Sequence, residues 1–176
     1  PVKITEPFQF LGMIEDDLAD AIGTDVAGVG AKGTFFGFPA EDCKGWRTWW
    51  GQEVLVPGGF EVDSTDEGDT LIYPGGDRSA RPSGRMPSGG YFFDAIIRQE
   101  PLPADEDLRV EDNLEEFGPL SDDDIRHFSD QSATARATGK YVIANFGGTG
   151  LGDIALVPAL HLPNPKGIRD VTEWYI

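Results

Sequence analysis

The sequence at residues 141–153 reads YVIANFGGTGLGD, a short apolar run followed directly by a glycine-rich turn. An apolar run of this length predicts a strand buried on both faces, as in a parallel sheet covered by helices. The glycines that follow can bring backbone N–H groups close to a phosphate or a carboxylate. The turn does not fit G-x-G-x-x-G, and no G-K-[ST] follows it, so a tight turn with close packing is the competing interpretation.

A helical pattern precedes this predicted strand, and another helical pattern precedes an earlier apolar run at residues 25–29. Ser121 and Asp124 resemble a capping box, and a weak apolar stripe leads from there to Gly139. Residues 168–176 predict a further helix after the glycine turn. Near the start, Thr5 suits the N-cap of a helix whose apolar residues recur at helical spacing, at Phe8, Leu11, Ile14, Leu18 and Ile22. Residues 25–29 follow as a second buried strand, and two helix-strand pairs predict an α/β fold.

Residues 37–94 differ in composition from the rest of the chain: they are rich in Gly, Pro, Trp and Asp and show no helical periodicity. Short β-prone runs at 53–56, 60–62 and 70–73 predict an antiparallel meander, with a hairpin turn at 66–69 and a fourth, aromatic strand at 91–97. We therefore predict a β insertion on an α/β frame. An acidic connector at 102–120, with a short helix near 110–117, leads to the second helix-strand pair.

The composition excludes several classes of function. The 176 residues carry 31 acids against 14 bases, a net charge of −17 that repels phosphate backbones and anionic lipids. We therefore expect no nucleic-acid partner and no membrane-surface role, and the longest apolar runs are too short for a membrane span. Cys43 is the only cysteine, which excludes an internal disulfide and favours a cytoplasmic location.

Three arginines are concentrated in one short loop of this acidic chain. Arg78, Arg81 and Arg85 either hold an anion over a pocket, through the bidentate geometry of guanidinium, or pair with local acids. Asp94 interrupts an aromatic run, where a carboxyl group either acts as an acid or base, caps a turn, or pairs with an arginine such as Arg85 or Arg98.

Three of the four tryptophans, Trp46, Trp49 and Trp50, cluster within a glycine-rich stretch. They form either a stacking platform for a flat ligand or part of the packing of the β insertion. The histidines, His127 and His161, have no cysteine or second histidine at ligand spacing, so we assign no metal ligand.

Three segments are distinctive: SGRMPSGGYFFD (83–94), YVIANFGG (141–148) and KGIRDVTEWY (166–175). Together they resemble a branch of the uroporphyrinogen decarboxylase superfamily, which also contains corrinoid-dependent methyltransferases. The resemblance covers nearly the whole chain and implies an α/β fold, a partial (β/α)8 TIM barrel carrying a small antiparallel β insertion. It implies a first helix-strand unit at 1–36, the β-rich insertion at 37–100, and a connector with the second helix-strand-helix unit at 101–176. Members of this superfamily are roughly twice as long, so we expect an N-terminal fragment.

The resemblance implies a parent enzyme, most readily a corrinoid-dependent methyltransferase, of which this segment is inactive by itself. Zinc ligands of such enzymes, a His-x-Cys pair and a later Cys, would lie beyond Ile176. A decarboxylase acting on a carboxylate-rich tetrapyrrole is the alternative, although the essential Asp of those enzymes has no counterpart at residues 30–34. A non-catalytic binding or assembly module that uses the tryptophan cluster is the third hypothesis.

The expected substrate-binding residues follow from these arguments. No catalytic residue or metal ligand is assigned in this segment, and corrinoid and zinc are expected only in the longer parent. The expected partners are an anionic small molecule or a corrinoid protein, with a homo-oligomer or association with the missing half-barrel. The substrate-binding residues are Arg78, Arg81, Arg85, Asp94, Asn145, Gly147, Gly148, Thr149 and Asp153.

Overall fold

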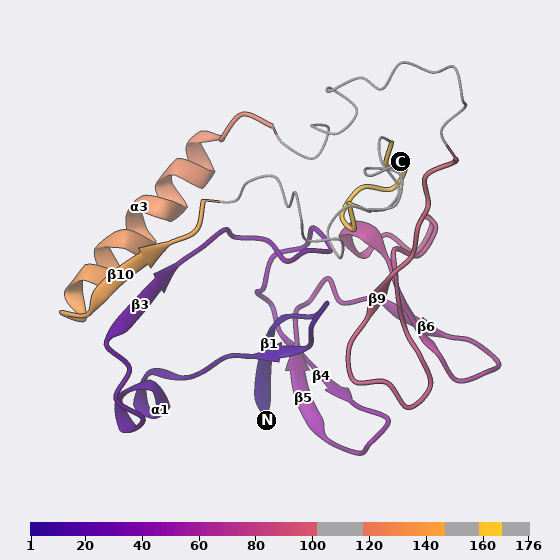
Figure 1. Ribbon diagram of the computed structural model, residues 1–176, viewed down its shortest axis with the longest axis horizontal. Coiled ribbons are helices and arrows are strands. Elements are labelled where there is room, and N and C mark those ends of the chain that lie inside the picture. The colour runs from indigo at the N-terminus through magenta and orange to yellow at the C-terminus, as the bar shows by residue number, and fades with distance from the viewer. Residues whose placement is uncertain (102–117, 147–158, 167–176) are drawn as a thin grey trace. The chain divides into compact units, whose positions relative to one another are not determined.

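Two compact units with interleaved sequences make up the described part of the chain. The computed structural model describes residues 1–101, 118–146 and 159–166 (Figure 1). Among these, residues 1–12, 33–101 and 159–166 form one unit, which we call the β unit. Residues 13–32 and 118–146 form the other, which we call the α/β unit.

The first sheet of the β unit is mixed, with the strand order β2-β1-β5-β4. Strand β1 pairs antiparallel with β2 and parallel with β5, and β4 pairs antiparallel with β5. Ile4, Val54 and Val56 are buried because alternate residues of a strand point to the same face. The strands are β1 (Val2–Glu6), β2 (Leu11–Gly12), β4 (Lys44–Arg47) and β5 (Glu53–Val56).

The second sheet of the β unit is antiparallel throughout, in the order β6-β7-β8-β9. The hairpin predicted at 66–69 is confirmed: Gly68 has a φ of 87°, and its N–H donates to the carbonyl of Thr65 at 3.0 Å. Glycine suits this position because its backbone adopts positive φ without a steric penalty. The elements are β6 (Val62–Ser64), β7 (Thr70–Ile72), the 3₁₀ helix η1 (Pro74–Gly76), β8 (Gly84–Met86) and β9 (Asp94–Ala95).

A phenylalanine-rich core holds the β unit together. Phe36, Phe60 and Phe93 are almost completely buried, and the Phe36 and Phe93 rings meet edge to face with their centroids 5.8 Å apart. Gly84 lets β8 approach this core, because a Cβ there would lie 2.8 Å from Ile72 and 2.9 Å from the Phe36 ring. The buried cluster comprises Ile4, Phe8, Phe36, Phe38, Val54, Val56, Phe60, Ile72, Met86, Phe93 and Leu160.

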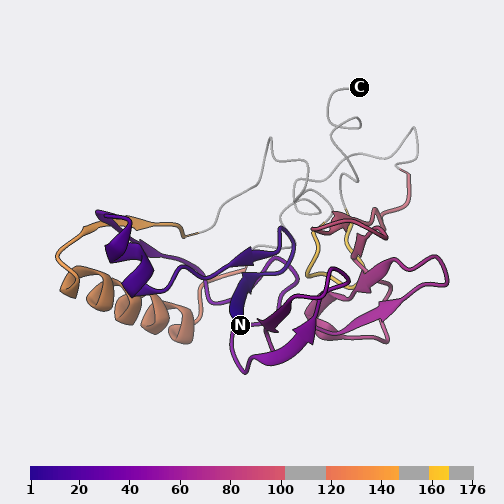
Figure 2. The same cartoon turned by 90° about the horizontal axis from the view of Figure 1, so that it is seen from below.

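The α/β unit consists of α1 (Asp16–Ala21), β3 (Val26–Val29), α3 (Asp122–Ala137) and β10 (Tyr141–Ala144). Strands β3 and β10 are parallel, with Val26 opposite Tyr141, and α3 packs along them, as Figure 2 shows. The predicted capping box is confirmed: the Asp124 N–H donates to Ser121 Oγ at 3.1 Å, and the Ser121 N–H donates to the Asp124 carboxylate at 2.9 Å.

The predicted partial (β/α)8 TIM barrel is wrong. Such a barrel needs successive parallel strands of one sheet, each followed by a helix. The described residues instead form three separate sheets, of which two are antiparallel or mixed, and α3 is the long helix among them. Within the described ranges, the parallel β3–β10 pair with α3 packed along it follows the predicted order of helix and strand. The predicted burial of these two strands is wrong, because all four residues of β10 and two of the four residues of β3 are exposed. The predicted meander is also divided, because β5 belongs to a different sheet from β6 and β7.

The helix predicted from Thr5 to Ile22 is largely wrong. Residues 2–6 form β1 and residues 11–12 form β2, and only Asp16–Ala21 is helical. Phe8 does face the core, but from the turn between two strands rather than from a helix. The parallel pairing of β1 with β5 outweighs the helical spacing, because that pairing buries Ile4 against distant residues.

Some predictions fall on residues outside the described ranges. These are most of the connector at 102–120, the helix at 168–176, and the glycine turn from residue 147 onward. In the ranges that are described, no helix is both long enough and apolar enough to cross a lipid bilayer.

Candidate functional site

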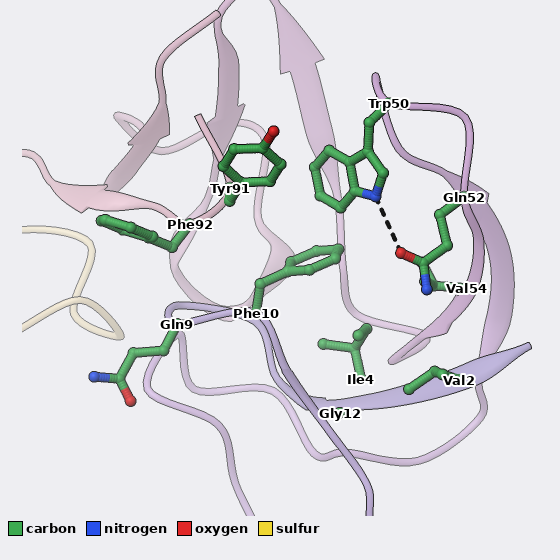
Figure 3. Close-up of a pocket in the computed structure, with 10 residues that line it drawn as sticks. All are labelled: Val2, Ile4, Gln9, Phe10, Gly12, Trp50, Gln52, Val54, Tyr91 and Phe92. Atoms are coloured by element: carbon green, nitrogen blue, oxygen red, sulfur yellow. Dashed lines mark hydrogen bonds between the residues drawn. The ribbon is translucent and has the colours of Figure 1, made fainter. Parts of the chain in front are cut away.

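A cavity of about 340 Å³ lies in the β unit and is lined largely by aromatic and aliphatic side chains (Figure 3). The rings of Phe10, Trp50 and Tyr91 gather at one end of it, and we call these three residues the aromatic corner. Val2, Ile4 and Val54 lie at the other end. The ten residues that line this aromatic pocket are Val2, Ile4, Gln9, Phe10, Gly12, Trp50, Gln52, Val54, Tyr91 and Phe92.

Three separate segments of the β unit bring the aromatic corner together. Phe10 comes from the turn between β1 and β2, Trp50 from the turn between β4 and β5, and Tyr91 from the loop between β8 and β9. The aliphatic end is formed by β1 and β5, whose parallel pairing sets Val2 opposite Val54. The floor is therefore a regular sheet, and the walls are loops above it.

The rings of the aromatic corner are inclined to one another. Phe10 and Trp50 have centroids 5.8 Å apart and planes at 77°, while Trp50 and Tyr91 are 5.1 Å apart at 49°. Tyr91 is 59% exposed, and Phe10 and Trp50 are half-buried, so part of this aromatic surface is open to solvent. Exposed rings arranged around a cavity are characteristic of a binding surface.

Hydrogen bonds fix the loops that carry these rings. The Trp49 indole N–H donates to the carbonyl of Gly90 at 2.6 Å, which ties the β4–β5 turn to the β8–β9 loop. The Trp50 indole N–H donates to the Gln52 side-chain oxygen at 3.0 Å. Both tryptophans also contact the Tyr91 ring. The corner is consequently assembled before any ligand arrives.

Glu6 fixes the segment that leads to Phe10. Its carboxylate accepts N–H groups of Phe8 at 2.9 Å and of Phe35 at 3.1 Å. Burial raises the pKa of this carboxyl group above its usual value, and the two backbone N–H bonds oppose the rise. The Phe10 N–H then donates to the carbonyl of Pro7 at 3.2 Å, and Phe10 adopts a φ of 55°, which turns its ring toward Trp46 and Trp50.

The pocket lining carries no charge. Its polar side chains are Gln9, whose amide points away from the three rings, Gln52, which accepts the Trp50 N–H, and the Tyr91 hydroxyl. No Asp, Glu, His, Lys, Arg or Cys is among the ten lining residues. Chemically, the pocket can stack on and enclose a small apolar group, but it offers no general base or nucleophile of ordinary strength.

Two arginines of the predicted anion-binding loop pair with acids. Arg85 Nε lies 2.5 Å from an Asp69 carboxylate oxygen, whose partner oxygen accepts the Ser88 N–H at 2.8 Å. The Ser88 N–H and then Arg85 lower the pKa of Asp69. Arg78 pairs with Asp63. Arg78 and Arg85 therefore pair with local acids, which was one of the two alternatives for this loop. Their role in holding an anion stays a prediction.

The remaining basic and acidic candidates of this region lie apart from the aromatic pocket. Arg81 and Asp94 are exposed. Arg98 is 6% exposed and donates to the carbonyls of Ala159, at 2.8 Å, and of Leu162. Burial, and secondarily the charge of Arg81, lowers the Arg98 pKa to about 10.

Asn145 lies in the other unit, one residue after β10. Its side chain is exposed, and its backbone N–H donates to the carbonyl of Val29 at 2.8 Å. Gly147, Gly148, Thr149 and Asp153 lie outside the described residues. The predicted substrate-binding set is thus divided between the two units and the part of the chain that is not described.

Sequence reasoning found part of the aromatic pocket. The sequence leaves open whether the tryptophan cluster is a stacking platform or part of the packing of the β insertion. In the structure Trp50 lines the pocket, whereas Trp46 packs on Phe60 with ring centroids 5.2 Å apart. Phe10 was missed because it falls inside the helix predicted from Thr5. Gln52 carried no signal, since a lone glutamine after a turn is unremarkable in sequence.

No protein-family model matches this chain, and no curated protein or solved structure matches it either. Within the described ranges, no group of three or more His, Cys, Asp or Glu side chains is arranged to hold a metal ion. The fold and the site therefore define the protein only by class: a β unit with an uncharged aromatic pocket, joined to an α/β unit.

Proposed function

We propose that the β unit is a binding module whose small-molecule ligand occupies the aromatic pocket. The observation that carries this proposal is the aromatic corner, three rings from three loops held around an open cavity. Solvent-exposed aromatic surface is costly unless it meets a partner, since burying it removes a large apolar area from water. A cytoplasmic location belongs to this proposal, because the lone Cys43 has no partner for a disulfide within the chain.

Binding is favoured over catalysis at this pocket by the nature of its lining. Acid–base and nucleophilic chemistry need a titratable or activated group within reach of the ligand. The lining offers amides, aliphatic groups, aromatic rings and the phenol of Tyr91, with no carboxylate, histidine or lysine among the lining residues to activate that phenol. These groups are suited to holding and orienting a ligand.

The test is a titration of the whole chain with neutral apolar probes, benzamide and 3,3-dimethylbutan-1-ol, followed by saturation-transfer NMR. We expect the chain to bind these probes and Trp50→Ala to weaken the binding about tenfold, as removal of a central aromatic anchor commonly does. Tyr141→Ala is the matched control, because Tyr141 is 78% exposed and lies in the α/β unit.

Circular dichroism of each variant confirms that it is folded. If the probes show no saturation transfer from the chain, or if binding survives both Trp50→Ala and Tyr91→Ala, the aromatic pocket is not a ligand site. Loss of binding in Tyr141→Ala alone would likewise contradict the proposal.

A second proposal concerns the α/β unit. We propose that it belongs to an enzyme of the decarboxylase and corrinoid methyltransferase kind that the sequence resembles. The specific observation in its favour is the parallel β3–β10 pair with α3 packed along it, since α/β enzymes place ligands beyond the carboxyl ends of parallel strands. Asn145 lies at that end of β10.

The coding sequence tests this second proposal. A His-x-Cys pair encoded downstream, together with zinc binding by the longer protein, would support methyl transfer to a thiolate acceptor. A longer protein that neither binds zinc nor transfers a methyl group from methylcobalamin would contradict methyl transfer. Turnover of a carboxylate-rich tetrapyrrole would identify the decarboxylase alternative.

A further inference from the structure

The aromatic corner presents ring faces in different directions rather than a parallel-walled slot. Its adjacent ring planes meet at 77° and 49°. A flat ligand can stack on only one such face at a time. A compact, nearly spherical group can instead touch several faces at once, each of which carries the negative side of the ring quadrupole.

The polar side chains that line the pocket are few, which narrows the class of ligand further. Of the pocket's two amides, the Gln9 amide points away from the rings, and the Gln52 oxygen already accepts the Trp50 N–H. A sugar brings several hydroxyl groups, more than the Tyr91 hydroxyl and the Gln52 amide can pair with among the lining side chains. A hydroxyl group that loses its water without gaining a protein partner weakens binding. A quaternary ammonium group has no N–H to satisfy, so it suffers no such loss.

The charge of the molecule favours a cation. The chain carries −17 overall, and such a field concentrates small cations near the surface. Four bases of the β unit, Lys44, Arg47, Arg78 and Arg85, make ion pairs with acids, and none of them lines the pocket. Lys3 lies between Val2 and Ile4 on β1, and alternation along a strand directs it away from the face that they share.

We propose that the aromatic corner binds the methylated quaternary ammonium group of a small organic cation. This inference rests on the proposed function, because it names the ligand class of the same pocket. Trp50 supplies the strongest cation–π surface, Phe10 and Tyr91 supply further faces, and the aliphatic end of the pocket accommodates the rest of the ligand.

The experiment compares choline with 3,3-dimethylbutan-1-ol, in which a neutral carbon replaces the charged nitrogen at the same shape. Both are titrated into the whole chain, and the dissociation constants are measured by ligand-observed NMR. We expect choline to bind about tenfold more tightly than its neutral isostere, the order expected from cation–π attraction in a partly desolvated site. Tetramethylammonium should retain most of this preference.

The variants are Trp50→Leu and Tyr91→Leu, which keep an apolar side chain but remove the ring. Each should abolish most of the preference for choline over the isostere, whereas Tyr141→Leu, outside the β unit, should leave it unchanged. Tyr91 is largely exposed, so its variant remains informative if Trp50→Leu fails to fold.

Each outcome decides the ligand class separately from the pocket itself. If choline and the isostere bind with equal affinity and both lose binding in Trp50→Leu, the proposed preference for a cation is wrong. The proposal that the β unit is a binding module is then still supported. Binding of methyl glucoside in preference to choline overturns the proposed cation in favour of a sugar. Absence of binding by every probe overturns both proposals together.

Discussion

Asp69 joins three parts of the β unit at a single side chain. It is 7% exposed, it accepts the Ser88 N–H, and it pairs with Arg85, while its backbone N–H donates to Thr65 Oγ at 3.2 Å. Its neighbour in the same hairpin, Asp66, is exposed. The β6–β7 hairpin and the loop after β8 are thus held together by one carboxylate.

We predict that Asp69→Asn makes the protein less stable at neutral pH. The folded-state pKa of Asp69 is lowered, so the folded state binds its proton less readily than the unfolded chain does. The stabilisation is therefore present above the unfolded pKa and is lost as the pH falls through the folded pKa. Thermal unfolding at a series of pH values should show a deficit of a few degrees near pH 7 that disappears in strong acid.

Asp66→Asn is the control for this experiment and should unfold like the parent chain at every pH. A deficit in Asp69→Asn that persists unchanged below the folded pKa would show that packing, rather than the ionised carboxylate, is responsible. Arg85→Gln should lower the stability less than Asp69→Asn, since it leaves the charged Asp69 carboxylate and its hydrogen bond from the Ser88 N–H in place.

At the scale of elements, α3 begins at a reciprocal pair of hydrogen bonds between Ser121 and Asp124. Three acidic residues in its first turn also stabilise the helix, because their negative charges lie near the positive end of the helix dipole. Because α3 contributes only Ala135 to the buried residues, these local interactions account for much of what holds it.

We predict that Ser121→Ala destabilises the α/β unit by about 1 kcal/mol, the usual cost of losing an N-cap side chain. Ser129→Ala is the matched control, because Ser129 is exposed in the interior of the same helix and alanine is the better helix former there. Urea unfolding followed by circular dichroism at 222 nm measures both. Equal midpoints for the two variants would show that the capping box is dispensable.

Elements with local signals could be predicted from sequence, and those that depend on distant partners could not. The capping box of α3 and the hairpin around Gly68 are encoded within a few residues, and both are confirmed. Strand β1 could not be predicted, because residues 2–6 adopt a strand conformation by pairing with β5, which lies far along the chain. That error placed Phe10 in a helix and hid one wall of the aromatic pocket.

At the scale of the whole molecule, the described residues divide into a unit with a dense core and a unit with little buried apolar surface. The β unit contains the phenylalanine-rich cluster. In the described part of the α/β unit, Val29 and Ala135 are the buried hydrophobic residues. Because apolar burial is the dominant favourable contribution to folding, the two units should differ in stability.

We predict that the α/β unit unfolds at a lower denaturant concentration than the β unit. The helical signal at 222 nm reports mainly on α3, and the fluorescence of Trp46, Trp49 and Trp50 reports on the β unit. The two transitions should therefore have different midpoints, which violates two-state behaviour. Coincident transitions would show instead that the units fold as one cooperative body.

The interleaving of the two units has a consequence for synthesis of the protein. Residues 13–32 complete the α/β unit only with residues 118–146, which a ribosome translates much later. At ordinary translation rates this interval lasts on the order of 5 to 20 seconds. During that time the apolar residues of β3 have no strand partner, so the nascent chain offers chaperones a binding segment before its own sheet can form.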